Sequence, residues 1–137
     1  AGRFEMWERD AAAQIGLGVA VEHALSWGID SIATRNDALA TGLRARLAEI
    51  PGVTVRDRGR QLCAITTFTI DGIDPEEVRR RLRAERVNVS VSTLDSAQLD
   101  LSNRGLESVV RASVHYVTTD DELDRFAHLL RQIAATA

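Results

Sequence analysis

The segment SVVRASVHYVTTDDELDRF, residues 108–126, constrains the fold most, because a strand signal in it leads directly into a helix start. Side chains alternate between the two faces of a strand, which predicts one apolar face made of Val110, Ala112, Val114 and Tyr116. Thr119 followed by Glu122 is typical of a capping box, the point at which a helix begins. The segment therefore predicts a half-buried strand followed by an amphipathic helix.

The opposite face of this strand would carry Val109, Arg111, Ser113 and His115. A strand holds an arginine by backbone on both sides, so the planar guanidinium points in a fixed direction and suits bidentate binding of a carboxylate. An ion pair with an acidic residue of a neighbouring helix explains Arg111 equally well, as does an arginine stem that lies over the sheet with its charge in water. His115 is compatible with a site or with water.

The remaining signals come in the order helix, helix, strand, strand, helix, strand, loop, strand, helix. Helical spacing runs from Asp10 to Trp27, where Gly16 and Gly18 suggest close packing against another element. Gly28 ends this helix and Asp30 is placed to cap a second one. Strands are expected at 53–55, 62–70 and 87–93, a helix after the N-cap residue Asp74, and a loop at 94–105.

This order predicts an α+β fold with a small antiparallel or mixed sheet of about four strands, helices packed on one face and a long connecting helix in front. The 137 residues suffice for one domain with a moderate core, and 45% hydrophobic with 27% charged residues is ordinary for a globular chain. The chain opens with AGRFEMWERD and no initiator methionine, as expected of a piece of a longer protein or, alternatively, of a chain from which a short leader has been removed.

Charge and composition argue against several classes of partner. The net charge of −3 gives no reason to expect nucleic acid or an acidic membrane surface, and no apolar run approaches the roughly 20 residues that span a bilayer. The single cysteine, Cys63, is compatible with a reducing compartment, and we expect a cytoplasmic protein.

Two kinds of catalytic chemistry lack support in the sequence. The three histidines, His23, His115 and His128, lie far apart, so no metal site is expected. Cys63 falls within an expected strand, where a buried and unreactive thiol is the usual case. The arginines between 79 and 86 follow Glu76 and Glu77 and are expected to form a solvated helix face with ion pairs along the helix, in preference to a phosphate site.

Three stretches taken together resemble the class V aminotransferase family of pyridoxal-phosphate (PLP) enzymes. VVRASVHYVTTDDELDRF resembles the family's final strand and acidic helix, which typically read R-x-S-x-x-Y-N-T. GRFEMWE resembles the R-F-E element between the large and small domains, and GIDPEEVRRRLRAERVNVSVS resembles a helix and strand that lead into the active-site cleft. The likeness covers nearly the whole chain and keeps the family's order.

This resemblance implies the C-terminal small domain of a fold-type I PLP enzyme, similar to cysteine desulfurases and isopenicillin N epimerase-like proteins. Residues 1–28 would be the segment and helix that connect to a missing N-terminal PLP-binding domain, and residues 29–137 the small domain. Arg111 would match the arginine that binds the α-carboxylate of an amino-acid substrate, with His115 as a supporting residue. The intact enzyme would be a homodimer.

The resemblance also implies that these residues are inactive alone. The family holds PLP covalently on a lysine of the large domain, and all 17 basic residues here are arginine, so no catalytic or cofactor-binding residue is assigned. MWERD replaces the G-T-P that follows R-F-E in desulfurases, and Val117 and Thr118 replace the family's tyrosine and asparagine. Residues 94–105 lack the cysteine that accepts sulfur in desulfurases. The alternative is a stand-alone α/β module that binds a ligand or a protein without catalysis.

Overall fold

The computed structural model describes residues 10–137 and divides the chain into two compact units, one within Ala1–Ala33 and one formed by Thr34–Ala137. The GRFEMWE element lies outside the described residues. The first unit contains helix α1 (Ala11–Trp27), which begins where Asp10 Oδ1 accepts a hydrogen bond from the Ala13 amide at 2.9 Å. Gly28, at a φ of 84° that favours glycine, ends the helix as expected.

Helix α1 exposes its apolar side chains. Six of them are between 49% and 71% exposed: Ile15, Leu17, Val19, Val21, Leu25 and Trp27. Apart from the adjacent residues and backbone of the same helix, no described atom lies within 4 Å of the position that a Cβ would take at Gly16 or Gly18, so the close packing expected there is not made by the described residues.

The second unit is built on a four-stranded sheet. Strands β1 (Val53–Val55), β2 (Ile65–Ile70), β3 (Ser90–Thr93) and β4 (Ser108–Ser113) lie in the order β1-β2-β4-β3, and each neighbouring pair is antiparallel. The expected α+β fold is confirmed, and the sheet is antiparallel throughout. The register places Thr67 of β2 and Ser90 of β3 on either side of Arg111 in β4.

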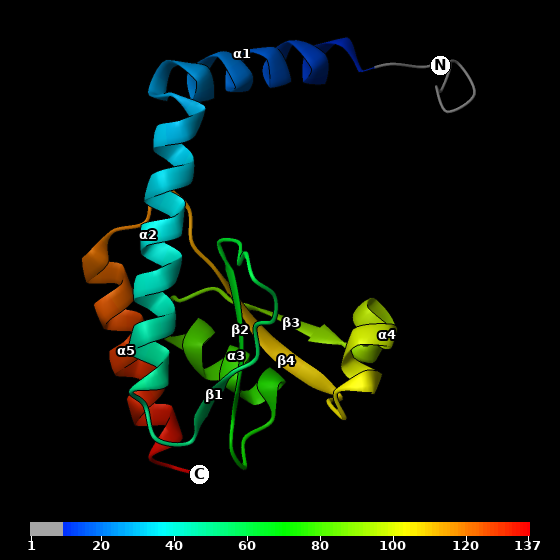
Figure 1. Cartoon of the computed structure of the whole chain (residues 1–137), viewed down its shortest axis with the longest axis vertical. Helices are drawn as coiled ribbons and strands as arrows, with labels where there is room; N and C mark the ends of the chain where they lie inside the picture. The colour runs from blue at the N-terminus through cyan, green and yellow to red at the C-terminus, as the bar shows by residue number, and fades with distance from the viewer. Residues whose placement is uncertain (1–9) are drawn as a thin grey trace. The chain divides into compact units, whose positions relative to one another are not determined.

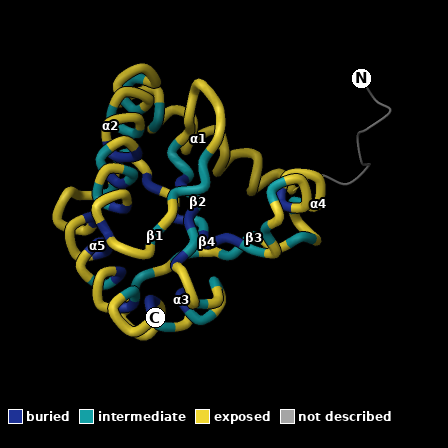
Figure 2. Tube along the Cα trace, turned by 60° about the horizontal axis from the view of Figure 1, so that its bottom comes forward, coloured by how far each residue is buried: buried dark blue, intermediate teal, exposed yellow. Residues whose placement is uncertain are grey.

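Helices α2 (Ile29–Ala48), α3 (Pro75–Ala84) and α5 (Asp120–Ala134) contribute to one hydrophobic core with the sheet (Figure 1). The buried positions of the second unit gather where these helices meet the strands (Figure 2). Phe68 of β2 and Phe126 of α5 meet edge to face there, with ring centroids 6.2 Å apart. Helix α4 (Leu94–Asn103) lies at the other end of the sheet, away from α2 and α5 (Figures 1 and 2).

The expected helix caps are confirmed at α3 and α5. Asp74 Oδ1 accepts a hydrogen bond from the Glu76 amide at 2.8 Å, and Pro75 is the first helical residue. Thr119 and Glu122 form the reciprocal capping box, with the Thr119 amide donating to Glu122 Oε2 at 2.8 Å and the Glu122 amide donating to Thr119 Oγ1 at 3.2 Å. Local sequence therefore determines where these two helices begin.

Residues 94–105 were expected to be a loop, but residues 94–103 form helix α4, so this prediction was wrong for most of the segment. The Ser96 hydroxyl accepts from the Thr93 amide at 3.2 Å and donates to the Thr93 carbonyl at 2.9 Å, which fixes the first turn. Ala97 then leaves the helical region, at φ −149° and ψ 43°. This kink breaks the spacing of apolar residues, so no regular period is visible in the sequence although Leu101 is buried.

Several element boundaries also differ from expectation. Helix α2 begins at Ile29, immediately after Gly28, so Asp30 lies in its first turn and is not its cap. Strand β2 begins at Ile65, three residues after the expected start, and β3 is limited to Ser90–Thr93. Among residues 10–137, no helix combines the length and the apolar composition that a bilayer crossing requires.

Candidate anion-binding site

Arg111 lies in the middle of β4, on the face of the sheet opposite the main core. Its neighbours Val110 and Ala112 are buried against the helices, which confirms the alternation expected from the sequence. The Arg111 side chain is half-buried between Thr67 and Ser90 of the flanking strands. The backbone pairing on both sides therefore fixes the position from which its guanidinium extends.

Arg111 has no acidic partner within residues 10–137. No hydrogen bond or ion pair joins its guanidinium to another described residue, so the interpretation of Arg111 as half of a structural ion pair has no support in that part of the chain. The guanidinium instead lines a cavity of about 370 Å³ on this face of the sheet.

The cavity is strongly basic. Five arginines and two aspartates line it: Arg44, Arg56, Arg58, Arg104, Arg111, Asp57 and Asp100. The chain as a whole carries a net charge of −3, so positive charge is concentrated here against the overall balance. A concave surface of one sign focuses the electrostatic field and attracts ligands of the opposite sign, which in this case are anions.

The two aspartates are already paired with two of these arginines. Asp57 Oδ2 lies 2.7 Å from Arg44 Nε, and Asp57 Oδ1 accepts from both the amide and the hydroxyl of Thr67, at 2.7 and 2.6 Å. Asp100 Oδ2 lies 2.6 Å from Arg104 Nη1. Both carboxylates are therefore engaged and do not neutralise Arg111.

The remaining arginines of the cavity wall are held differently. Arg56 Nε donates to Thr69 Oγ1 at 2.9 Å, and Arg104 Nη2 donates to the Arg56 carbonyl. Neither Arg56 nor the exposed Arg58 has an acidic partner among the described residues. Three guanidinium groups of the cavity thus lack a counter-charge within residues 10–137.

His115 is not brought to this cavity. Strand β4 ends at Ser113, so the alternation that would have placed His115 on the face of Arg111 stops two residues earlier. His115 is exposed, its amide donates to Thr118 Oγ1 at 3.1 Å, and its ring lies 4.6 Å from the ring of Tyr116. Its supporting role in a substrate site stays a prediction.

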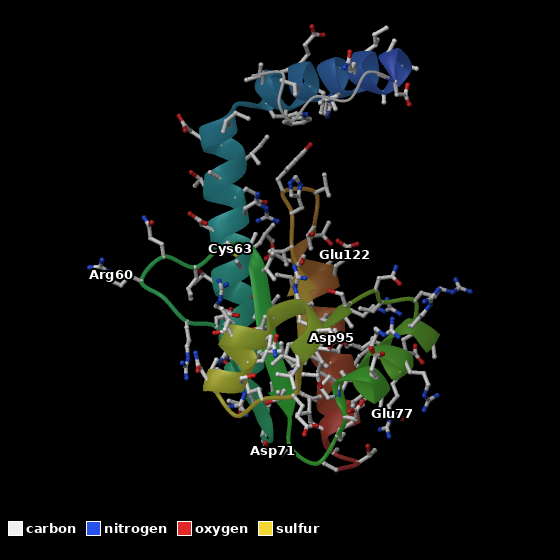
Figure 3. All side chains as sticks on the ribbon, turned by 90° about the vertical axis from the view of Figure 1, so that its right-hand side faces the viewer. Arg60, Cys63, Asp71, Glu77, Asp95 and Glu122 are labelled. Carbon is white, nitrogen blue, oxygen red and sulfur yellow. The ribbon has the colours of Figure 1, made fainter. Side chains whose placement is uncertain are left out.

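Cys63, by contrast, lines the cavity, against expectation. The sequence suggested a buried thiol within a strand, but β2 begins two residues later and Cys63 is exposed. The Cys63 carbonyl accepts a hydrogen bond from Arg44 Nη2 at 2.7 Å, which ties this segment to α2. Figure 3 shows Cys63 beside the strand, and Arg60 in the same loop extending away from the fold.

The arginines of α3 form the solvated face that the sequence predicted. Glu76 pairs with Arg79, and Glu77 pairs with both Arg80 and Arg81, each at 2.6 Å. The hydrogen bonds from Arg80, then those from Arg81, lower the pKa of Glu77 from 4.5 to about 2. These guanidinium groups are engaged with the helix itself, away from the cavity.

The chemistry of the cavity suits a carboxylate better than a metal or PLP itself. Among residues 10–137 no three metal-binding side chains of the His, Cys, Asp or Glu type come together. PLP requires a lysine amine for its covalent attachment, and the sequence contains arginine only. A guanidinium that is held by a sheet and has no partner among residues 10–137 has the geometry to bind a carboxylate through two parallel hydrogen bonds.

Of the residues that line the cavity, only Arg111 was predicted from the sequence to belong to a binding site. No role was predicted for the arginines of the segment RDRGR, residues 56–60, or for Arg44. The alternation of arginine with aspartate directly after β1 is a signal that could have indicated a charged site. The pairing of Asp57 with Arg44 and Thr67 joins residues that are far apart in the sequence, so no local sequence pattern predicts it.

Comparison with known proteins finds relatives that match nearly the whole chain. Residues 3–126 match the model of the family described as Aminotransferase class-V. A probable cysteine desulfurase of Mycobacterium leprae is 33% identical over 132 residues, 96% of this chain and 21% of that protein. A probable hercynylcysteine sulfoxide lyase of Mycobacterium tuberculosis is 36% identical over 132 residues, 95% of this chain and 32% of that protein.

Solved structures show the same fold. The apo cysteine desulfurase of Thermococcus onnurineus superimposes with a TM-score of 0.90 at 20% identity, over 98% of this chain and 34% of that one. A cysteine desulfurase of Escherichia coli gives 0.83 at 22% identity, over 93% of this chain and 31% of that one. The chain thus spans between a fifth and about a third of the length of these relatives.

Proposed function

Because the chain belongs to the class V aminotransferase family, we propose that it is the C-terminal small domain of a PLP-dependent enzyme that acts on an amino acid. Residues 29–137 would form this domain and residues 1–28 the segment that connects it to a PLP-binding domain. Two observations support this assignment: the chain covers only part of the length of its relatives, and it contains no lysine. These residues alone would then be inactive.

We assign to Arg111 the binding of the substrate's α-carboxylate. The observation that carries this proposal is the unpaired, half-buried guanidinium held between two strands at the wall of a basic cavity. A carboxylate there would accept two parallel N–H···O hydrogen bonds, which fix the orientation of the amino acid as well as its position. His115 lies outside this cavity, so the proposal rests on Arg111.

Orientation of the substrate is the contribution that this chain would make to catalysis. PLP, when bound in the intact enzyme, supplies an electron sink for the bonds at the amino acid's Cα. Arg111 would hold the carboxylate so that the substrate approaches in one orientation, which lowers the entropic part of the barrier. Residues of the PLP-binding domain would then decide which bond breaks.

The family membership leads us to propose a cytoplasmic homodimer for the intact enzyme. Relatives of this chain include proteins named cysteine desulfurases and a probable hercynylcysteine sulfoxide lyase. Residues 94–103, which form α4, contain no cysteine to accept sulfur. We therefore propose an amino-acid substrate whose reaction does not pass sulfur to a cysteine of this segment.

Replacing Arg111 in the intact enzyme tests this function. Arg111→Ala should lower kcat/KM by about 30- to 1,000-fold, as expected for the loss of a charge-assisted bidentate pair worth about 2–4 kcal/mol. Arg111→Lys should recover only part of the loss, because an ammonium lacks the planar geometry. Absorbance of the bound cofactor should not change in either variant.

Arg60→Ala is the matched control, since Arg60 is exposed and does not line the cavity of Arg111. It removes the same charge outside the cavity and should leave kcat/KM close to that of the parent enzyme. Equal kinetics for Arg111→Ala and Arg60→Ala would remove Arg111 from the substrate site.

A further inference from the structure

We propose that the cavity of Arg111 selects amino-acid substrates that carry a second anionic group, and that Arg56 and Arg58 bind this group. The inference rests on the proposed role of Arg111 and extends it to the class of substrate. One α-carboxylate requires one guanidinium, whereas three guanidinium groups of the cavity have no acidic partner among residues 10–137.

Arg56 is positioned on the same face of the sheet as Arg111. Its Nε donates to Thr69 Oγ1 at 2.9 Å, and Thr69 lies two residues from Thr67, the residue paired with Arg111. Two residues along a strand span about 7 Å and return the side chain to the same face. Arg56 and Arg111 therefore lie on the same face of the sheet and line the same cavity.

The contacts of Arg56 leave its two terminal nitrogens, Nη1 and Nη2, available to bind a ligand. The bond to Thr69 uses Nε, and Arg104 is bound to the Arg56 carbonyl, so side chain and backbone are both fixed while neither Nη atom has a described partner. Such a group loses little conformational entropy when an anion binds. Arg58 is exposed and supplies a second cation at the same wall.

Electrostatics favours a second negative charge over a neutral group. Arg56 and Arg111 are both half-buried, and like charges that share a partly desolvated cavity repel one another more strongly than they do in bulk water. A dianionic ligand relieves this repulsion at both positions, whereas a monoanion relieves it at one. The alternative to a second anionic group of the substrate is an acidic side chain, from residues outside this sequence, that pairs with Arg56 and Arg58.

Succinate and its monoamide succinamate test the proposal, because they have similar shape and differ by one negative charge. Binding of each to the intact enzyme is measured by calorimetry at low ionic strength. We expect succinate to bind at least about tenfold more tightly, as one added charge-assisted pair predicts. Arg56→Gln should reduce this preference to about twofold or less and leave succinamate binding unchanged.

Two further variants make the outcome decisive. Arg58 has no described side-chain partner, so Arg58→Gln leaves the fold intact and should also reduce the preference for succinate. Arg60→Gln removes an equal charge outside the cavity and should leave the preference as it is. Equal affinity of the parent enzyme for the two ligands would overturn the proposal in favour of an acidic side chain as occupant. An equal weakening of both ligands by Arg56→Gln would also overturn it, because Arg56 would then not distinguish the second negative charge.

Failure of this inference is distinguishable from failure of the proposed function. Arg111→Gln should weaken succinate and succinamate alike, because both contain the carboxylate that Arg111 would bind. If Arg111→Gln weakens both while the parent enzyme shows no preference, the second-anion site is absent and the role of Arg111 stands. If Arg111→Gln changes neither affinity, the proposed function itself is wrong.

Discussion

Asp57 and Thr67 are joined by two hydrogen bonds, since Asp57 Oδ1 accepts from the Thr67 amide at 2.7 Å and from its hydroxyl at 2.6 Å. The other oxygen of Asp57 lies 2.7 Å from Arg44 Nε. Thr67 is also the residue that pairs with Arg111 across β2 and β4. Both oxygens of Asp57 are thereby engaged by residues other than Arg111, although Arg111 lies in the neighbouring strand.

Asp57→Asn should lower the free energy of unfolding by about 1.5–3 kcal/mol, because it removes the carboxylate of a mostly buried ion pair and leaves Arg44 without a counter-charge. Urea denaturation of the 137-residue chain measures this change. Glu49→Gln is the control, since Glu49 and Arg131 are 4.0 Å apart and both well exposed. That variant should cost less than about 0.5 kcal/mol; equal costs would contradict a structural role for Asp57.

The packing of helix α4 can be tested with two leucines of the same helix. Leu101 is 1% exposed and Leu99 is 84% exposed. Leu101→Ala should destabilise the chain by about 2–4 kcal/mol through lost burial and a new cavity, whereas Leu99→Ala should cost under about 0.5 kcal/mol. Similar losses for both variants in urea denaturation would mean that this segment does not pack as described.

Glu77 should titrate near pH 2, well below its ordinary value of 4.5, because Arg80 and Arg81 stabilise the carboxylate. A pKa that folding lowers contributes stability that is fully present above pH 4.5 and is lost as the pH falls toward 2. The side-chain carboxyl resonance in an NMR titration reports this pKa directly.

The ion pairs of Glu77 are partly exposed to solvent, so salt should weaken the effect. Added salt should move the pKa of Glu77 upward, and Arg80→Gln should move it further, since Arg80 is its principal partner. An ordinary pKa that neither salt nor Arg80→Gln alters would show that these pairs do not form in solution.

The exposed apolar side chains of α1 should make the isolated chain self-associate. Six of them, from Ile15 to Trp27, are between 49% and 71% exposed. Together they form a larger exposed apolar patch than a monomeric protein usually has. Light scattering should show species larger than the 15.0 kDa monomer. A chain that begins at Ile29 should stay monomeric and folded; monomers in both cases would contradict the account of α1.

The sequence predicts best those parts of the fold that depend on neighbouring residues. The caps at Asp74 and Thr119, the stop at Gly28 and the buried positions Leu39, Leu43 and Leu47 of α2 follow from chemistry within one or two helical turns. The alternation around Arg111 likewise identified both faces of β4.

The features that the sequence does not predict depend on contacts between distant segments. The kink at Ala97 interrupts the helical spacing of apolar residues in α4, so the sequence shows no helical period there. The burial of Leu101 becomes visible only in the folded structure. The charge of the cavity depends on which arginines have partners, and the fold decides this by bringing Arg44 of α2 to Asp57. Arg111 could be identified as a candidate from its strand, but its lack of an acidic partner among residues 10–137 could not.

A structure of the intact enzyme with a bound amino-acid analogue tests the central claim most directly. The account predicts both carboxylate oxygens of the analogue within about 2.7–2.9 Å of the Arg111 guanidinium nitrogens, in the parallel geometry of a bidentate pair. A carboxylate bound by other residues, with Arg111 in contact only with water or paired with an acidic side chain of the protein, would contradict it.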